Sequence, residues 1–195
     1  AGIKHCIFLS SRAVYTDNNR WEVLTEESET KPESLYGVVK LAGEIALENL
    51  CDEAFAGTVL RVTGVYGVPP GAARHKWSDL FAAFENGEEL PPRVGTEVHG
   101  EDLAAAVSLV LKRDRSQTAD LEFYNVSDIM LDRHDLLKLH ASVSGVSQPL
   151  PTRAEGPVGV MEAGKLKVLG WNPGGKARLN AFLMDVAMKR NRRPH

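Results

Sequence analysis

Short apolar strands alternate with helices along this chain, and this alternation constrains the fold more than any other feature of the sequence. Residues 5–10 form an apolar run, residues 34–51 carry apolar side chains at helical spacing, and residues 58–62 are short and β-branched. After two further predicted helices, residues 121–126 alternate as another strand. Helices that alternate with strands place the chain in the α/β class.

The apolar spacing also predicts the core. In the 34–51 helix, Val38, Leu41 and Ile45 fall on one face, which we expect to be buried. A helix over residues 76–85 is expected to contribute its large apolar side chains to the core; these are Trp77, Leu80, Phe81 and Phe84. Three isolated histidines are predicted on the surface, namely His75, His134 and His140.

The composition excludes several classes of protein. A chain of 195 residues suffices for one domain, or for one domain and a small lobe. With 43% hydrophobic and 25% charged residues it is ordinary for a globular protein, and its net charge of −3 gives no reason to expect a nucleic-acid partner. No apolar run approaches the roughly 20 residues that span a bilayer, so we expect no membrane association.

The two cysteines bear on the cellular compartment. Cys6 and Cys51 show none of the spacing of a disulfide framework or a metal site. The first residues also lack a basic region followed by a long apolar segment, the pattern of a secretory signal. Two unpaired thiols fit a reducing environment, so we expect a cytoplasmic protein without a metal centre.

Tyr36 and Lys40 lie one helical turn apart, so their side chains share one face of the predicted helix. A phenol is a poor acid or base at neutral pH, but a nearby ammonium favours its ionised form. Such a pair suits proton transfer to or from an alcohol or a carbonyl. The same spacing also arises by chance, with a half-buried tyrosine beside a solvated lysine, so the surrounding motifs must decide between the two interpretations.

The motifs around this pair decide the question. Two hydroxyls, Ser10 and Ser11, end the first strand, and an acidic loop with Pro32 leads to Tyr36. The later motifs are Leu60-Arg-Val-Thr-Gly-Val-Tyr-Gly67, Val98-His-Gly-Glu-Asp-Leu103 and Leu169-Gly-Trp-Asn-Pro173. Together they resemble the extended short-chain dehydrogenase/reductase superfamily, specifically its NAD-dependent epimerase/dehydratase family.

The resemblance implies the C-terminal part of a Rossmann-type, doubly wound parallel sheet and a small substrate-binding lobe. Residues 1–67 would supply the late part of the dinucleotide-binding domain. Residues 68–195 would form mainly the small lobe, with some segments that return to the sheet. The glycine-rich turn that approaches the dinucleotide pyrophosphate is absent from the sequence, so we expect the C-terminal portion of a longer enzyme.

The resemblance also implies roles for individual side chains. Tyr36 would exchange a proton with the substrate oxygen, and Lys40 would assist it and hydrogen-bond the nicotinamide ribose. Ser11 would polarise the substrate carbonyl, which agrees with the ability of a hydroxyl to donate and to accept. Ser10 is the alternative, although strand alternation places it on the opposite face. Thr63 aligns with a position that contacts the nicotinamide.

Two other residues in these motifs are interpreted as structural. Arg61 lies inside a strand, where an unpaired guanidinium would be costly, so we expect it to meet an acid such as Asp102. His99 corresponds to a histidine that, in the family, mainly fixes the junction between a strand and a helix.

Two departures from the family pattern concern the substrate. Nucleotide-sugar members usually carry Asn at the position of Gly64, and they commonly carry, at the position of Gly95, an Arg that pairs with a diphosphate. Arg93 lies nearby, and we expect it to substitute only if its loop shifts. Loss of both anchors favours a smaller hydroxyl or carbonyl compound, such as a sugar acid or a keto compound.

These inferences predict an NAD(P)-dependent oxidoreductase that transfers a hydride and acts on a small molecule, with Tyr36 as the acid/base. The alternative is a nucleotide-sugar epimerase or dehydratase, but Arg12 and Ala13 stand where a dehydratase usually has Asp and Glu. A non-catalytic NAD(P)-binding sensor or scaffold is the alternative from another class, although such proteins tend to lose the Tyr–Lys pair. The sequence does not choose between NAD and NADP, and the resemblance implies a homodimer.

Overall fold

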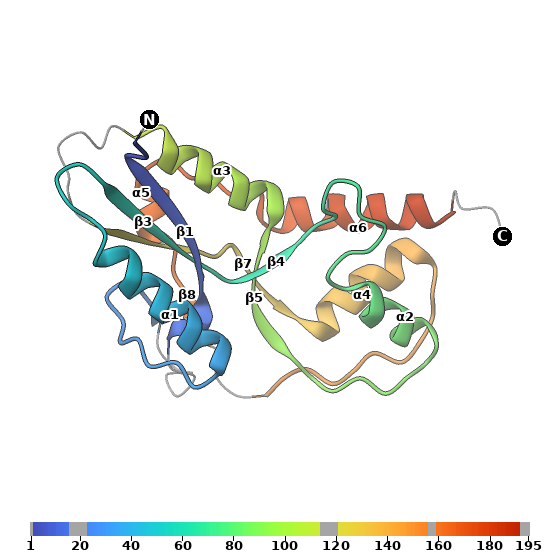
Figure 1. Ribbon diagram of the computed structural model, residues 1–195. Coiled ribbons are helices and arrows are strands. Elements are labelled where there is room, and N and C mark those ends of the chain that lie inside the picture. Colours follow the sequence, from blue (N-terminus) through green and yellow to red (C-terminus); the bar gives the residue numbers. More distant parts are fainter. Residues whose placement is uncertain (1, 16–22, 114–120, 156–158, 192–195) are drawn as a thin grey trace.

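The computed structural model describes residues 2–15, 23–113, 121–155 and 159–191. The molecule is elongated, with the N-terminal strands in one half and the C-terminal helix extending along the other (Figure 1). Strands and helices alternate along the chain, which confirms the predicted α/β class. Among the described residues, no helix is both long enough and apolar enough to cross a bilayer.

A parallel three-stranded sheet forms the first half. Its strands are β1 (His5–Ser11), β3 (Ala56–Val62) and β6 (Glu122–Val126), in the order β1-β3-β6. Because β3 lies between the two others, every one of its residues is buried. The three carboxyl ends point the same way, which brings the residues that follow β1 and β3 to one edge of the sheet.

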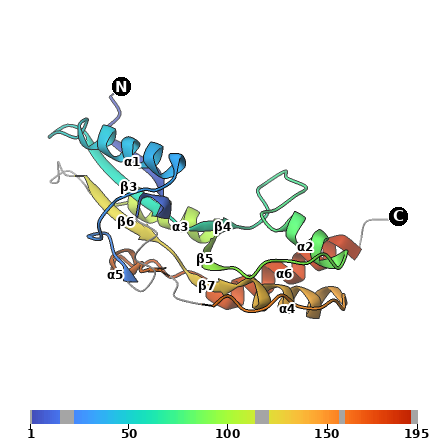
Figure 2. The same ribbon diagram turned by 90° about the horizontal axis from the view of Figure 1, so that it is seen from below.

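Helices cover both faces of this sheet. Helix α1 (Leu35–Glu48) packs on one face, and α3 (Gly100–Leu111) and α5 (Gly164–Val168) pack on the other (Figure 2). The core on the α3 side includes Leu60, Val98, Val110, Tyr124, Leu166 and Trp171. This doubly wound arrangement is the one that the resemblance implies.

The second half is built on a smaller, mixed sheet. Strand β5 (Val94–His99) pairs in parallel with β4 (Gly64–Tyr66) and antiparallel with β7 (Ile129–Asp132). The sequence analysis predicted neither β4 nor β7, because strands of three and four residues are too short to show a clear alternation.

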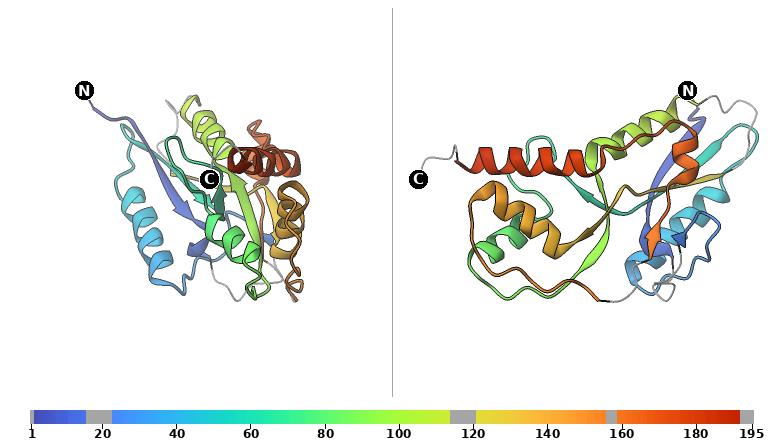
Figure 3. Two further views of the ribbon diagram at one scale, coloured as in Figure 1. Left: turned by 90° about the vertical axis from the view of Figure 1, so that its right-hand side faces the viewer. Right: turned by 180° about the vertical axis from the view of Figure 1, so that it is seen from behind.

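Three helices pack around the second sheet, namely α2 (Ser78–Glu85), α4 (Arg133–Ser144) and α6 (Gly175–Asn191) (Figure 3). Trp77, Phe81 and Phe84 are buried there, as predicted, with Tyr66, Leu137 and Leu183. Asp132 caps α4, because its side chain accepts a hydrogen bond from the backbone N–H of His134.

A late segment returns to the first half. Strand β8 (Val160–Met161) pairs in parallel with β2 (Val23–Leu24). Arg12 donates a hydrogen bond from Nη2 to the carbonyl of Gly159 at 3.2 Å, and Asn125 donates from Nδ2 to the carbonyl of Leu24. The segment is thereby held beside the carboxyl end of β1.

The predicted buried face of α1 is wrong at two of its three positions. Val38 and Ile45 are 49% and 50% exposed, and only Leu41 packs inward, against a small cluster around Val14. The helix turns Glu44 toward the sheet instead. An acid faces inward because the sheet presents a buried cation at that point.

That cation is Arg61, and its predicted partner was wrong. Arg61 Nη2 lies 2.7 Å from Glu44 Oε2, and both side chains are almost fully buried. Ser10 donates a hydrogen bond to the other carboxylate oxygen, and Arg61 also donates to the hydroxyl of Tyr15. Asp102 cannot reach this cluster, because α3 covers the opposite face of the sheet.

The surface prediction for the isolated histidines also fails. His140 is only 2% exposed, stacks on Phe81 with ring centroids 3.9 Å apart, and lies 2.9 Å from a carboxylate oxygen of Glu85. His75 and His134 are partly buried. Packing of α2 against α4 buries His140, a long-range contact that no local pattern indicates.

Candidate active site

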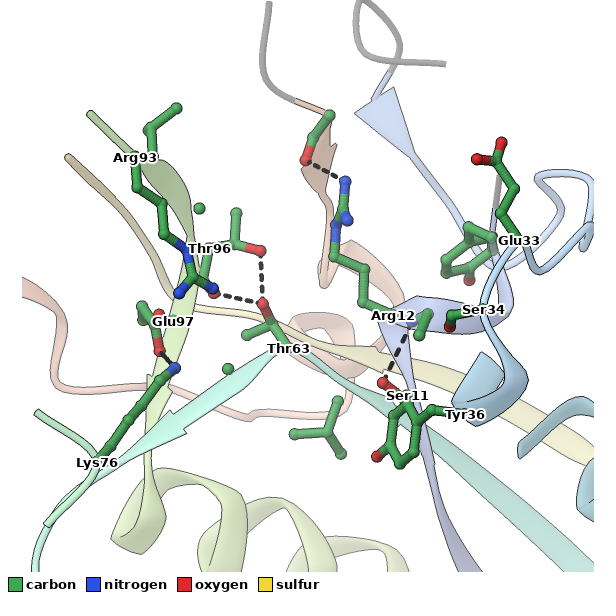
Figure 4. A pocket seen from close by; sticks show the side chains of 17 residues that line it. Ser11, Arg12, Glu33, Ser34, Tyr36, Thr63, Lys76, Arg93, Thr96 and Glu97 are labelled. Carbon is green, nitrogen blue, oxygen red and sulfur yellow. Dashed lines mark hydrogen bonds and ion pairs between the residues drawn. The ribbon is translucent and has the colours of Figure 1, made fainter. Parts of the chain in front are cut away.

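A cavity of about 460 Å³ opens at the carboxyl edge of the first sheet, where the two halves meet. Ser11 and Arg12 reach it from the end of β1, Tyr36 from the start of α1, and Thr63 from the end of β3 (Figure 4). The opposite wall is formed by Lys76, Arg93, Gly95, Thr96 and Glu97. The cavity thus lies where ligands bind in open α/β sheets.

The two serines at the end of β1 face different surroundings. Ser10 is buried and hydrogen-bonded to Glu44, whereas Ser11 lines the cavity. The Ser11 hydroxyl accepts a hydrogen bond from the backbone N–H of Ala13 at 3.2 Å, and so caps the short 3₁₀ helix η1 (Arg12–Val14). Strand alternation had assigned the two hydroxyls to opposite faces, and their contacts agree.

The first turn of α1 presents Tyr36 to the cavity. Ser34 caps this helix by accepting a hydrogen bond from the backbone N–H of Gly37 at 3.1 Å. Tyr36 is 57% exposed and lines the cavity. Gly37 allows a close approach, since a Cβ there would overlap the carbonyl oxygen of Ala13.

Lys40 lies beside the same turn. Its Nζ is 5.7 Å from the ring centroid of Tyr36 and 5.2 Å from that of Phe8, and it donates a hydrogen bond to the carbonyl of Leu9 at 2.8 Å. The ammonium is therefore held near the phenol by a backbone acceptor. Lys40 is not among the residues that line the cavity.

Thr63 is tied to the facing strand. Its buried hydroxyl donates a hydrogen bond to the carbonyl of Thr96 at 2.5 Å and lies 2.6 Å from the Thr96 hydroxyl. The Thr63 side chain thereby joins the two halves at the floor of the cavity. Ser11, Tyr36 and Thr63 all reach one cavity, and Lys40 lies directly behind Tyr36.

The sequence analysis missed an ion pair in the opposite wall. Lys76 and Glu97 pair across the cavity wall, directly over Gly64. The two residues come from the segment before α2 and from β5, so no spacing in the sequence indicates that they meet. The nearest signal is the position of Glu97 directly before the motif that begins at Val98.

Arg93 lines the cavity, and its expected replacement of the missing arginine after a shift of its loop stays a prediction. Arg93 directly precedes β5 and Gly95 is the second residue of that strand, and both line the cavity. A smaller cavity of about 220 Å³ continues beyond this point and is lined by Arg93, Arg133 and Leu136, among others. Burial and the neighbouring guanidinium of Arg93 both lower the pKa of Arg133.

His99 lies at the junction between β5 and α3. Its Nδ1 accepts a hydrogen bond from the backbone N–H of Glu101 at 3.2 Å, which caps α3. Its ring meets the ring of Tyr66 edge-on, with centroids 5.0 Å apart, and burial lowers the pKa of the imidazole. These contacts match the structural interpretation, and His99 lies outside the first cavity.

A parallel sheet with helices on both faces, and with a cavity at the carboxyl edge of its strands, defines a Rossmann-type α/β protein. The model of the NAD dependent epimerase/dehydratase family matches residues 1–127. The chain therefore belongs to that family. A search of the curated proteins finds no significant match.

Solved structures with the same fold span nearly the whole chain. A UDP-glucose 4-epimerase from Thermotoga maritima is 23% identical with a TM-score of 0.75, and the match covers 97% of this chain but 65% of that one. A UDP-glucuronic acid 4-epimerase from Bacillus cereus, solved with UDP-glucuronic acid and NAD, is 18% identical with a TM-score of 0.74 and coverages of 98% and 63%. The chain thus spans about two thirds of the length of these proteins.

Proposed function

We propose that the cavity is the substrate end of an NAD-dependent active site that transfers a hydride between the cofactor and a hydroxyl-bearing carbon of a small molecule. The observation that carries the proposal is that Ser11 and Tyr36, from separate elements, line one cavity at the carboxyl edge of a parallel sheet. Family membership supports the same reading.

In this proposal each side chain has one role. The phenolate of Tyr36 takes the proton from the substrate hydroxyl as the hydride leaves, and in the reverse direction the phenol returns that proton to the carbonyl oxygen. Ser11 donates a hydrogen bond to the same oxygen in both directions and stabilises the negative charge that develops on it during the transfer. Lys40 holds its positive charge near the ring of Tyr36 and hydrogen-bonds the nicotinamide ribose.

The residues present fit the nicotinamide half of a dinucleotide. Tyr36 offers a half-exposed phenol at the cavity, Lys40 lies behind it, and Thr63 lies at the end of the next strand. When bound, NAD supplies the hydride acceptor or donor. NAD is preferred to NADP because the B. cereus neighbour was solved with NAD.

The second candidate is a nucleotide-sugar 4-epimerase. The neighbours favour it, since the T. maritima protein was solved with UDP-glucose and the B. cereus protein with UDP-glucuronic acid. Gly64 and Gly95 argue against it, because both positions lack the side chains that nucleotide-sugar members usually carry.

The proposal is tested by Tyr36→Phe and by the matched pair Ser11→Ala and Ser10→Ala in the full-length protein. Turnover of uronates, neutral sugars and UDP-sugars is followed by NADH absorbance and by chromatography of the products. We expect Tyr36→Phe to lower kcat by roughly 10²–10⁴-fold with nearly unchanged NAD affinity. Ser11→Ala should lose activity and Ser10→Ala should retain it. Full activity of Tyr36→Phe would refute the role of the phenol.

The two predicted regions of the sequence contribute different parts of the site in this proposal. Residues 1–67 contribute the dinucleotide side with Ser11, Tyr36 and Lys40, and residues 68–195 contribute mainly the substrate side. We also propose a homodimer that forms through α1, because Val38, Val39 and Ile45 expose an apolar face on that helix. Sedimentation of the protein as a monomer at micromolar concentration would remove the dimer.

A further inference from the structure

One cation in the two cavities differs from the others. Arg12 donates to the carbonyl of Gly159, Lys76 pairs with Glu97, and Arg133 donates to the carbonyl of Pro91. Within the described part of the chain, the Arg93 side chain forms no hydrogen bond and no ion pair, although it lines both cavities. The guanidinium of Arg93 therefore has its N–H donors available to a ligand.

The position of Arg93 relates it to the reacting groups. Figure 4 shows its guanidinium directed toward Thr96, on the wall that faces Ser11 and Arg12 across the cavity. Ser11 and Tyr36 line the same cavity of about 460 Å³. A small molecule can thus meet the hydroxyl and phenol at one end and the guanidinium at the other.

The ion pair over Gly64 restricts what that molecule can be. A Cβ at Gly64 would overlap the Nζ of Lys76 and would lie 2.8 Å from the Cδ of Glu97, so the pair fills the space of a side chain there. Glu97 also keeps a buried negative charge in this wall and neutralises Lys76. Because Glu97 already neutralises Lys76, the positive charge that no carboxylate balances among the described residues of this wall lies on Arg93, with Arg133 beside it, and this charge suits an anionic group of a ligand.

We propose that Arg93 binds a carboxylate of the substrate, which assigns the substrate to the sugar acids. A guanidinium and a carboxylate match in a planar, bidentate pair, which fixes orientation as well as charge. The carboxylate at Arg93 then directs a hydroxyl of the same molecule toward Ser11 and Tyr36. The inference rests on the proposed function for that hydroxyl end, while Arg93 is a specificity residue of the same cavity.

The test is a titration of the isotope-labelled chain, followed by NMR, with D-glucuronate and D-galacturonate, with the neutral sugars D-glucose and D-galactose, and with UDP-glucose. Arg93→Gln removes the charge, and Arg153→Gln is the matched control because Arg153 is an exposed arginine paired with Asp135 outside both cavities. We expect the uronates to bind at least tenfold more tightly than the neutral sugars. Arg93→Gln should abolish that preference, and Arg153→Gln should keep it.

Three results would overturn the inference. These are equal binding of uronates and neutral sugars, a preference for uronates that survives Arg93→Gln, and tighter binding of UDP-glucose than of any uronate. Absence of binding by every compound would overturn it as well, provided that the spectrum is that of a folded chain. Tyr36→Phe separates this inference from the proposed function, because it should keep the preference for uronates over neutral sugars while it removes turnover. Uronate binding that depends on Arg93, without turnover in the full-length protein, would refute only the proposed function.

Discussion

Replacement of Glu44 by Gln tests how α1 is held on the sheet. The side chains of Glu44 and Arg61 are 3% and 6% exposed, and their closest atoms are 2.7 Å apart. Glu44→Gln leaves Arg61 charged and buried beside a neutral amide. Removal of one partner of such a pair costs about 3–5 kcal/mol of unfolding free energy. For a chain of this size we expect a fall in Tm of roughly 6–20 °C.

Differential scanning calorimetry and urea unfolding measure this effect. Asp185→Asn is the matched control, since Asp185 pairs with Lys189 on the exposed side of α6 and its loss should cost under about 0.5 kcal/mol. A second variant, Glu44→Leu with Arg61→Met, removes both charges and should recover most of the loss. The reasoning fails if Glu44→Gln costs under about 1 kcal/mol, or if the double variant is no more stable than Glu44→Gln.

Two further perturbations test local features of the fold. Gly37→Ala should lower the unfolding free energy by about 1–3 kcal/mol, because the new Cβ would overlap the carbonyl of Ala13. Gly95 has open space around it, so Gly95→Ala should change the unfolding free energy by under about 0.5 kcal/mol. Equal effects of the two substitutions in urea unfolding would contradict this reasoning. Burial lowers the pKa of His99, so its neutral form favours the folded state, and the stability that it contributes above about pH 6.5 is lost as the pH falls toward the folded pKa. His99→Asn keeps a side-chain cap for α3 but removes the titrating imidazole. The fall in Tm between about pH 7.5 and pH 5.5 should therefore be smaller in this variant. An unchanged fall in Tm would show that other groups cause it.

Sequence reasoning reached the parts of the site that depend on short-range geometry. Ser10 and Ser11 were assigned to opposite faces by strand alternation, and Tyr36 and Lys40 to one face by helical spacing, because neighbouring residues share one regular backbone. The same reasoning failed for the inner face of α1. Apolar spacing selected Val38 and Ile45, but the helix turns Glu44 inward because Arg61 lies beneath it.

Sequence reasoning also missed contacts between residues that lie far apart in the chain, as the cavity wall opposite Tyr36 shows. Lys76, Arg93 and Glu97 come from the approaches to α2 and β5 and from β5 itself, and they share a wall only because the second half packs across the edge of the first sheet. The sequence did not show that Arg93 lines this wall, because strand alternation assigns no direction to the side chain of a residue just outside a strand.

The sequence by itself determined the order and type of most elements, the family, and the candidate reacting groups. Each of these depends on propensity, periodicity or a local motif, which act over a few neighbouring residues. The tertiary structure alone decided that Arg61 pairs with Glu44 rather than Asp102, that His140 is buried, and that Lys76 and Glu97 cover Gly64. Such partners are far apart in the chain, and charge attraction or packing selects among them only after the layers have brought them into contact.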